Sequence, residues 1–358
     1  MGGKDSASER YIFTQLNSIT RLIYPELDDA VLDYLDDDGD QVEPVYYVPI
    51  IPMVLVNGMN GIGTGFSTTI PKYNPKEITK YIMNRLRNKS VKELRPYYRG
   101  FKGKIIQLDD KNYISKGIYE IKDNNTIIIN ELPIGKWTDD YKIFLDKLLV
   151  DDSRKKSKEV KKKSKLQIID YKNDSSDKEV CFTVTVPNGF ISSLQWSEDK
   201  HIDGIEKYFK LTTTKGLSIK NIHLYNEKQQ IKKYQEVKEI IDEFYKIRYN
   251  LYIARKEYQL NEYINHLGYL SAKIKFIKQV IEEEILIYRR KRQLIIGDLI
   301  KGGYPQYINN KISDVSKDID TNYYDYLIKI SLYSFTEEEI EKLQKEFDKT
   351  MQDKIELE

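Results

Sequence analysis

A long stripe of apolar residues that no proline interrupts is the feature that most constrains how this chain folds. Between about residues 231 and 296, apolar side chains recur every three or four positions, from Val237, Ile240 and Ile241 to Ile281 and Ile285. This spacing puts them on one face of a helix. About 65 residues at ~1.5 Å each predict a rod about 95 Å long. Because such a stripe needs a partner helix to cover it, a coiled coil is expected.

A later segment supplies that partner. Thr336 and Glu339 have the spacing of a capping box, which marks the start of a helix. The residues that follow place five apolar side chains on one face, namely Ile340, Leu343, Phe347, Met351 and Ile355. We expect an antiparallel return helix, with the compact aromatic segment 322–335 at the far end of the rod.

The first two thirds of the chain have a different pattern of residues. Residues 10–35 show helical spacing, with one stripe formed by Ile12, Leu16, Ile19, Leu22 and Ile23. Residues 42–75 are rich in proline, glycine and β-branched side chains, which predicts short strands and turns. A short amphipathic helix is expected over 76–88. Alternating residues with turn signals predict mainly strands from about 97 to 225.

Composition excludes several classes of protein. The 358 residues are enough for two or three domains. A balance of 58 basic and 56 acidic residues does not by itself name a nucleic-acid partner. The single cysteine, Cys181, rules out an internal disulfide and favours a reducing compartment. With three scattered histidines, a His-based metal site is not expected. The sequence contains no apolar run long enough for a membrane span and no N-terminal signal region.

Two segments imitate well-known binding loops but lack a required residue. The glycine-rich segment 57–67 has the glycine spacing of a P-loop, yet Thr64 stands where lysine is needed, and Phe66 replaces the third glycine of a dinucleotide fingerprint. The acidic segment around Gly39 has Tyr34 and Val45 where a calcium loop requires acidic ligands. For this acidic segment, a solvated turn is favoured over a metal site. The same interpretation is favoured for the pair Asp318 and Asp320.

Ile62 and the basic run 154–165 each leave two interpretations open. Ile62 lies between glycines, so it either plugs the core or forms a wedge that enters a base step of DNA. Its spacing alone favours the core. The basic run holds eight basic residues and one acid, which favours a solvated loop over a nonspecific phosphate contact.

The pair Arg10 and Tyr11 follows a run of small residues. A phenol that attacks phosphorus must lose its proton, and a neighbouring arginine can stabilise the charge that develops on the phosphate. The small residues Gly2, Gly3, Ser6, Ala7 and Ser8 would allow a DNA backbone to approach. The pair alone supports a tyrosyl phosphodiester intermediate only weakly, because such pairs are common.

The order of several segments resembles the C-terminal part of the breakage-reunion core of eukaryotic-type (type IIA) DNA topoisomerase II. They are "GGKDSASERYIFTQL", "VEPVYYVPIIPMVLVNGMNGIGTGFSTTIP", "NELPIGKWTDDYK", "KYFKLTTTKGLSIK", "EFYKIRYNLYIARKEYQL" and "YDYLIKISLYSFTEEE". The resemblance covers nearly the whole chain in collinear order. It implies an α+β multidomain fold with three parts. Residues 1–48 would be the end of a winged-helix domain, 49–230 a β-rich tower, and 231–358 an antiparallel coiled coil with a helical exit gate and a truncated return helix.

The resemblance also assigns roles to residues. It implies that Tyr11 is the nucleophile that becomes attached to a DNA 5′ end, and that Arg10 stabilises the transition state. Ile62 matches the isoleucine that intercalates and bends DNA, which reverses the preference for the core. Lys4 lies in the loop that approaches the scissile strand. Further DNA contacts are implied for Lys210, Thr212, Thr213 and Thr214. Glu9, where the family usually has proline, puts a negative charge near the DNA and could alter local affinity.

The implied function is that of an ATP-hydrolysing type II topoisomerase, which passes one DNA duplex through a transient double-strand break. In that family Mg²⁺ and ATP are bound by Toprim and ATPase domains, whose motifs this sequence does not contain, so no metal ligand is assigned here. We therefore expect a fragment that is inactive alone, dimerises through the exit gate and acts with Toprim and ATPase parts in cis or in trans. The alternative is a noncatalytic DNA-binding and dimerisation module.

Overall fold

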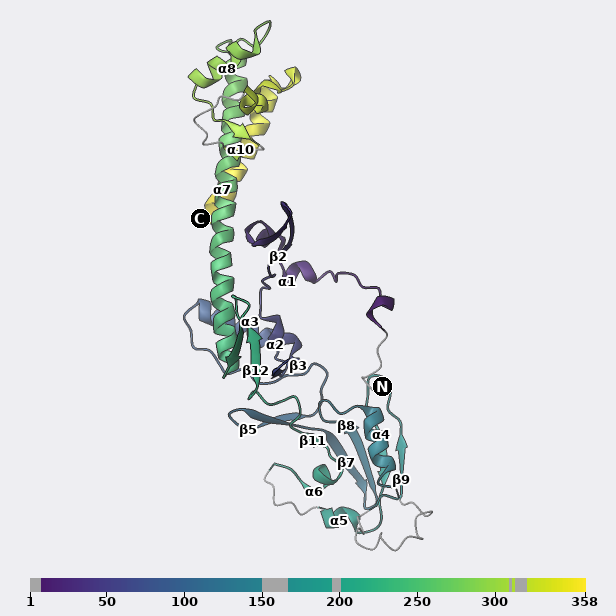
Figure 1. Cartoon of the computed structure of the whole chain (residues 1–358). Coiled ribbons are helices and arrows are strands. Elements are labelled where there is room, and N and C mark those ends of the chain that lie inside the picture. Colours follow the sequence, from purple (N-terminus) through teal and green to yellow (C-terminus); the bar gives the residue numbers. More distant parts are fainter. Residues whose placement is uncertain (1–7, 150–166, 195–200, 309–310, 313–320) are drawn as a thin grey trace. The chain divides into compact units, whose positions relative to one another are not determined.

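A computed structural model describes residues 8–149, 167–194, 201–308, 311–312 and 321–358 (Figure 1). Lys4, the basic run 154–165 and the pair Asp318 and Asp320 lie outside these residues. The chain forms two compact units. The first holds the described residues up to Tyr24 together with Val48–Arg248, and the second holds Pro25–Tyr47 and Tyr249–Glu358.

The start of the chain does not form the helix predicted for residues 10–35. It contains the 3₁₀ turn η1 (Glu9–Tyr11) and a single helical turn, α1 (Thr20–Ile23). Phe13, Leu16 and Leu22 of this stretch are largely or fully exposed. An apolar stripe stabilises a helix only when something covers it, and isolated short helices are marginal in water. The prediction therefore fails because this stripe is uncovered.

The centre of the first unit is a small core built from helices and hairpins. Its elements are α2 (Met53–Asn57), β3 (Met59–Gly63), β4 (Phe66–Ile70), α3 (Pro75–Leu86), β12 (Ile222–Tyr225), β13 (Ile231–Tyr234) and the first turns of α7 (Val237–Ile281). The amphipathic helix expected over 76–88 is confirmed as α3, which begins with the N-cap Asn74 and a proline. The expectation of only strands and turns over 42–75 is wrong at α2, which buries Leu55 against Ile70 and Tyr73.

Two antiparallel sheets form the rest of the first unit. One has the strand order β11 (Thr212–Thr213), β6 (Asn112–Lys116), β5 (Lys104–Asp109). The other has the order β7 (Ile118–Asp123), β8 (Thr126–Glu131), β10 (Phe182–Thr185), β9 (Asp170–Asn173). The turn predicted at Asn124-Asn125 is confirmed, and the turn predicted at Asp109-Asp110 lies one residue later, at Asp110-Lys111. Helices α4 (Thr138–Asp146), α5 (Phe190–Leu194) and α6 (Gly204–Tyr208) close a core with the second sheet through Tyr141, Phe190 and Phe209.

The long helix α7 confirms that the predicted stripe lies on a helix, although Ile264 and Ile281 of the stripe are exposed and the helix is shorter than expected. Its 45 residues span about 68 Å instead of about 95 Å. Glu283 adopts a left-handed conformation with φ 59°. The N–H of Glu283 donates to the carbonyl of Val280 at 3.2 Å, which is one of the two bonds of a Schellman motif, and the N–H of Ile285 donates to the carbonyl of Gln279 at 3.0 Å. Ile285 packs in the same core as Phe276. These features form a helix stop of the Schellman type.

The second unit gathers around the later part of α7. Its other elements are η2 (Glu26–Val31), β1 (Tyr34–Asp37), β2 (Asp40–Pro44), α8 (Arg292–Lys301), β14 (Tyr307–Ile308), β15 (Lys311–Ile312), η5 (Thr321–Tyr324), α9 (Asp325–Ile328), η6 (Leu332–Ser334) and α10 (Glu337–Leu357). Thr336 accepts from the N–H of Glu339 and so caps α10, as predicted.

Helix α10 returns antiparallel along α7. Lys256 contacts Glu358, His266 contacts Glu346, and Ile277 packs with Leu343. Residue numbers therefore rise along α7 where they fall along α10, as expected for antiparallel helices. Met351 and Ile355, predicted to lie on the packed face, are exposed. Among the described residues, no helix combines the length and the apolar character that a membrane crossing requires.

A largely buried ion pair fixes residues 25–47 to α7 within the second unit. Nη1 of Arg255 lies 3.1 Å from Oδ1 of Asp28. Replacing Asp28 by alanine should lower the free energy of unfolding of this unit by about 2–4 kcal/mol, because the guanidinium stays buried without its partner. The double variant D28A/R255M should recover part of that loss. Urea denaturation measures both, and the exposed Asp36→Asn is the matched control. Equal losses for D28A and D36N would contradict the prediction.

Candidate nucleic-acid interface

The proposed nucleophile lies on an exposed turn. The N–H of Tyr11 donates to the carbonyl of Ser8 at 2.9 Å, which closes η1. The Tyr11 side chain is 71% exposed. The guanidinium carbon of Arg10 lies 5.3 Å from the centroid of the Tyr11 ring, within the range of a cation–π contact. The two side chains predicted to act together are therefore in contact, and the phenol is open to a macromolecular substrate.

Ile62 projects from the end of a hairpin. Strands β3 and β4 pair Ile62 with Ser67 and Gly63 with Phe66, and Thr64 and Gly65 make the turn between them. Gly65 has a φ of +75°, which favours glycine at that position. Ile62 is 92% exposed. The preference for the core that its spacing suggested is therefore wrong.

The glycines on either side of Ile62 are not required by the protein itself. A Cβ atom added at Gly61 would meet nothing within 4 Å, and one at Gly63 would meet only the carbonyl oxygen of Phe66, at 4.0 Å. Gly58, at the base of the hairpin, differs. It has a φ of +66°, and a Cβ there would lie 2.9 Å from the carbonyl oxygen of Ile70. The open space at Gly61 and Gly63 suits an outside backbone that approaches closely.

The base of the hairpin is braced by the segment that leads into β12. The N–H of Thr69 donates to the carbonyl of Asn221 at 2.8 Å, and the Asn221 amide donates to the Ser67 hydroxyl at 2.6 Å. His223 donates through Nδ1 to the Ser67 carbonyl at 2.9 Å and packs edge-on against Phe66. Sequence reasoning missed both Asn221 and His223. No motif marks them, because their partners lie about 150 residues away.

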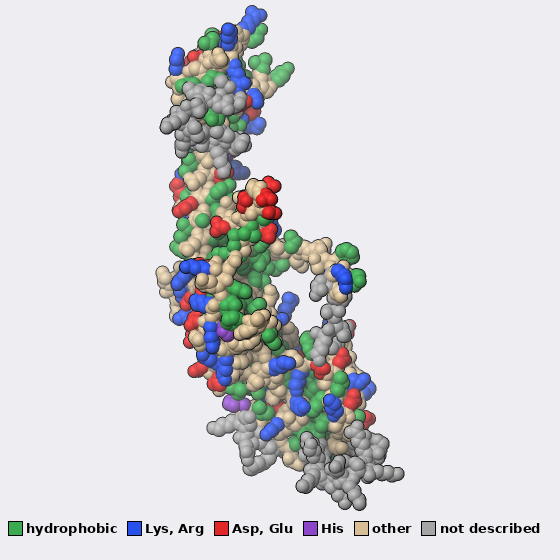
Figure 2. Space-filling model, viewed as in Figure 1, with side chains coloured by type: hydrophobic (Ala, Val, Ile, Leu, Met, Phe, Trp, Pro, Cys, Tyr) green, Lys and Arg blue, Asp and Glu red, His purple; other side chains and the backbone are tan. Residues whose placement is uncertain are grey.

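The other predicted DNA contacts lie at the edge of the three-stranded sheet. Thr212 and Thr213 form β11 and pair with Lys116 and Ser115 of β6, and Thr214 follows in an exposed turn. Figure 2 shows Lys and Arg side chains over the part of the face that carries β11 and β8 in Figure 1. Lys116 is neutralised by a close ion pair with Glu206, at 2.6 Å. Charge for an anionic partner must therefore come from other lysines.

Lys210 and Lys136 form a coupled pair beside this edge. Lys210 has a φ of 51°, uncommon for a residue with a side chain, and its ammonium lies 4.5 Å from the centroid of the Phe144 ring. Lys136 donates through Nζ to the carbonyl oxygen of Lys210. Burial, and then the charge of Lys210, lower the pKa of Lys136 to about 8. The only sequence signal for Lys136 is its place in the "NELPIGKW" segment.

The structure brings some of these residues together and leaves others apart. The hairpin and the sheet edge belong to one compact unit and are linked by residues 214–221. Among the described residues, no hydrogen bond, ion pair or ring contact joins residues 10 and 11 to either of them. Within the same ranges there is no cluster of three or more His, Cys, Asp and Glu side chains that could hold a metal ion. The described residues thus offer a surface and a phenol, without a side-chain cluster that could hold a metal ion.

We expect alanine at Gly61 or Gly63 to leave the free energy of unfolding within about 1 kcal/mol of that of the parent chain. The added methyl group should nevertheless weaken binding of duplex DNA, because it occupies space that an approaching backbone needs. Alanine at Gly58 should destabilise the chain by about 1–3 kcal/mol. Thermal unfolding and fluorescence anisotropy with a labelled duplex measure the two effects. Unchanged DNA affinity in both G61A and G63A would count against this surface.

Comparisons with known proteins identify a matching family and several relatives. Over residues 1–358 it matches the family of the A-type subunits of DNA gyrase/topoisomerase IV. DNA topoisomerase 2 of Arabidopsis thaliana is 37% identical over 377 residues, which cover 97% of this chain and 24% of that protein. DNA topoisomerase 2 of Acanthamoeba polyphaga mimivirus is 37% identical over 388 residues, 96% of this chain and 30% of that protein.

A solved structure is similar over almost the whole chain. It is the DNA-binding, cleavage and re-ligation domain of Plasmodium falciparum topoisomerase II, with a TM-score of 0.79 and 34% sequence identity. The match covers 99% of this chain and 48% of that one. The chain therefore has the fold of the matched part of that domain, about half of it. It spans about a quarter of the length of the Arabidopsis thaliana and Plasmodium falciparum relatives.

Proposed function

This chain belongs to the type II DNA topoisomerase family, and on that premise we propose that it is the part of such an enzyme that binds, cleaves and re-ligates DNA. The observation that carries the proposal is the contact between Arg10 and the exposed phenol of Tyr11. Both residues stand at the positions where the family resemblance places its nucleophile and its arginine. A packing tyrosine would instead be buried, as Tyr141 is.

The proposed chemistry is a reversible transfer of a phosphodiester. The phenolate oxygen of Tyr11 forms a bond to a DNA phosphorus, while the bond between that phosphorus and the 3′ oxygen of the neighbouring nucleotide breaks. The 3′ oxygen takes up one proton, which balances the one that the phenol loses on ionising, and leaves as a hydroxyl, while the 5′ end stays attached to the protein. Re-ligation runs the same steps in reverse. Arg10 is suited to neutralise the charge on the equatorial phosphate oxygens.

The hairpin and the sheet edge would shape the DNA for this step. An exposed isoleucine between two open glycines is suited to enter a base step, which costs a few kcal/mol of unstacking that added contacts offset. Lys210 with Thr212, Thr213 and Thr214 would hold backbone phosphates alongside. We also propose that Lys4, in the segment before Tyr11, approaches the scissile strand. In these roles, the hairpin and the sheet edge would together form the DNA-binding surface of the tower.

Metal and nucleotide chemistry would belong to other parts of the complete enzyme. The described residues do not fit a Mg²⁺ site, and Thr64 replaces the lysine of a P-loop. We therefore propose that Toprim and ATPase parts, in cis or in trans, supply Mg²⁺ and ATP hydrolysis. The helices α7 and α10, as a coiled coil ending in an exit gate, would join two copies of the chain, so that each copy cuts one strand and a second duplex passes through.

The nucleophile can be tested by covalent trapping. The chain mixed with a Toprim-containing fragment, Mg²⁺ and supercoiled DNA should give protein-linked cleavage. Tyr11→Phe should abolish the adduct, and Arg10→Ala should reduce its rate of formation about 10²-fold. The exposed Tyr333→Phe is the matched control. Denaturing gels with labelled DNA measure the adduct. An undiminished adduct with Y11F would refute the assignment.

The second candidate function is a noncatalytic module that binds DNA and dimerises. Experiments on the chain alone test it. That candidate predicts a dimer by size-exclusion chromatography and no cleavage by the chain alone, even with Mg²⁺. The absence of a metal-ligating cluster among the described residues favours this behaviour for the isolated chain. Robust Mg²⁺-dependent cleavage without a second protein would exclude it.

The lowered pKa of Lys136 predicts a pH dependence for DNA binding. Below pH 8 this ammonium is protonated and adds to the charge beside Lys210, whereas above pH 8 it becomes neutral. Affinity for a duplex at fixed ionic strength should therefore fall between pH 7 and pH 9. Lys136→Gln should flatten that pH profile and reduce the salt slope by about 0.9. The control Lys215→Gln, an exposed lysine near the same strand, should weaken binding and keep the pH profile. Fluorescence anisotropy measures both, and an unchanged profile in K136Q would contradict the prediction.

A further inference from the structure

Ile62 stands on one face of its hairpin, and the opposite face carries other side chains. Residues directly opposite each other in an antiparallel pair have their side chains on the same face, and neighbours along a strand alternate. Strands β3 and β4 pair Ile62 with Ser67, so these two share a face, while Phe66 and Thr68 lie on the other. A support that leaves Ile62 free to meet DNA is therefore best placed on the face of Phe66 and Thr68.

His223 of β12 lies against that opposite face. Its backbone N–H donates to the Thr68 hydroxyl at 3.2 Å, and its ring packs edge-on against Phe66, with 5.6 Å between the ring centroids. Its Nδ1 lies 2.9 Å from the carbonyl oxygen of Ser67. Because a carbonyl only accepts, Nδ1 carries the proton of this bond. One residue thus contacts three consecutive residues of β4, directly behind the position that pairs with Ile62.

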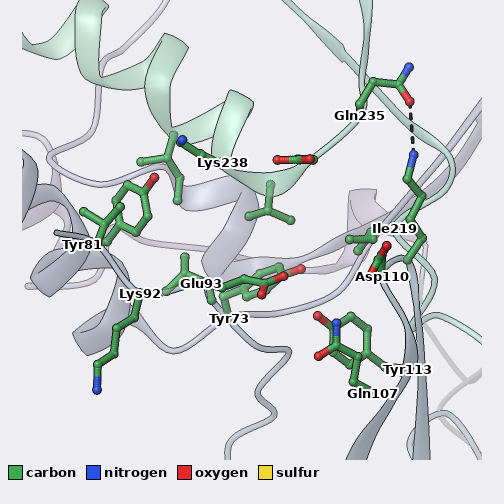
Figure 3. A pocket seen from close by; sticks show the side chains of 16 residues that line it. Tyr73, Tyr81, Lys92, Glu93, Gln107, Asp110, Tyr113, Ile219, Gln235 and Lys238 are labelled. Carbon is green, nitrogen blue, oxygen red and sulfur yellow. Dashed lines mark hydrogen bonds between the residues drawn. The ribbon is translucent and has the colours of Figure 1, made fainter.

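The strand that carries His223 is itself anchored in the first unit. Its neighbour Ile222 is fully buried, and the N–H of Ile219 donates to the carbonyl of Lys111 at 2.9 Å. Lys111 also donates through Nζ to the side chain of Gln235 at 3.4 Å, which joins the turn between β5 and β6 to the end of β13, the partner strand of β12. Figure 3 shows this bond and Ile219 around one cavity. The support behind the hairpin therefore rests on packed elements.

A wedge opens a base step only if it does not give way. Inserting an apolar side chain costs free energy because the bases unstack, and the DNA pushes back on the wedge with the same load. A two-stranded hairpin is marginally stable by itself, so an unsupported end would tilt away instead of opening the step. Phosphate contacts supply a large share of the affinity for DNA and do not depend on the wedge. The support of the hairpin should therefore affect bending far more than binding.

We propose that His223 is a positioning residue for the Ile62 wedge. It holds the hairpin from behind, so that insertion of Ile62 bends the DNA instead of displacing the hairpin. This inference rests on the proposed function, in which Ile62 enters a base step. His223 acts through residues 66–68 and has no contact with the reacting phosphate.

Bending and binding measured on the same duplex test the proposal with the whole chain. A duplex with a dye at each end reports bending by energy transfer at saturating protein, and fluorescence anisotropy reports affinity. His223→Leu removes the side-chain donor and the aromatic edge. It should lose most of the protein-induced change in energy transfer, while affinity changes less than about threefold, because the phosphate contacts remain. His223→Gln keeps a donor for Ser67 and His223→Phe keeps a ring against Phe66, so each should retain part of the bend.

A double-variant cycle separates this inference from the proposed function. Ile62→Ala should lose the bend by itself, and H223L should have no further effect in the I62A background, because no wedge is left to position. Tyr225→Leu, at an exposed position on the same strand, is the matched control and should bend DNA like the parent. An unchanged bend in I62A would overturn the proposed wedge and the role of His223 with it.

Other outcomes bear on His223 alone. A full bend in H223L, where I62A loses it, would refute the role of His223 and leave the proposed wedge intact. An equal loss of bend in Y225L would refute it as well, because the effect would then be a general one on the strand. A loss of affinity in H223L as large as the loss of bend would indicate a direct DNA contact instead of a support. Thermal unfolding checks that the variants are folded at the temperature of measurement.

Discussion

The short seam between β4 and residues 221–223 is the interaction on which the candidate DNA surface depends. A two-stranded hairpin such as β3–β4 is marginally stable by itself. Here the N–H of Thr69 donates to Asn221, and the Asn221 and His223 side chains both bond to Ser67. The seam rests on a core formed by Leu55, Ile70 and Ile222 among others. The end that carries Ile62 is thereby held at a fixed place, although Ile62 itself is almost fully exposed.

The same stretch of chain connects the two surfaces assigned to DNA. Lys210 and β11 lie at one end of residues 210–223, where the sheet edge is fixed by β6, by Lys136 and by the ring of Phe144. Asn221 and His223 lie at the other end. A binding surface works best when rigid elements hold its contacts. One short segment, with Lys210 at one end and Asn221 and His223 at the other, would therefore preorganise both the proposed wedge and the proposed phosphate contacts.

Sequence patterns predicted the parts of this fold that local physics determines. Alternation and turn signals located β5 to β8, an amphipathic pattern located α3, a capping box located α10, and the apolar stripe located α7. The end of α7 was missed because the stop is made by Glu283 in a conformation that usually signals itself through glycine. The spacing of residues around Ile62 could not predict that its side chain is exposed. A hairpin has two faces, and only tertiary contacts decide which of them is covered. The pairing of Lys136 with Lys210 joins positions 74 residues apart, which no local pattern encodes.

The proposed nucleophile, Tyr11, differs from the proposed DNA-shaping surfaces in how it is held. Tyr11 sits on one 3₁₀ turn, and its contacts among the described residues come from its neighbours Ser8 and Arg10. In-line attack on phosphorus tolerates errors of only about 0.5 Å in the position of the attacking atom. A turn flanked by the uncovered side chains of Phe13, Leu16 and Leu22 does not impose such a limit. Under the proposed function, the chain thus separates two tasks: it bends the DNA with elements that are already rigid, and it relies on the bound DNA and the other parts of the enzyme to order the phenol. Such a division would tie cleavage to assembly, because the reactive geometry forms only once the substrate and the remaining parts are in place.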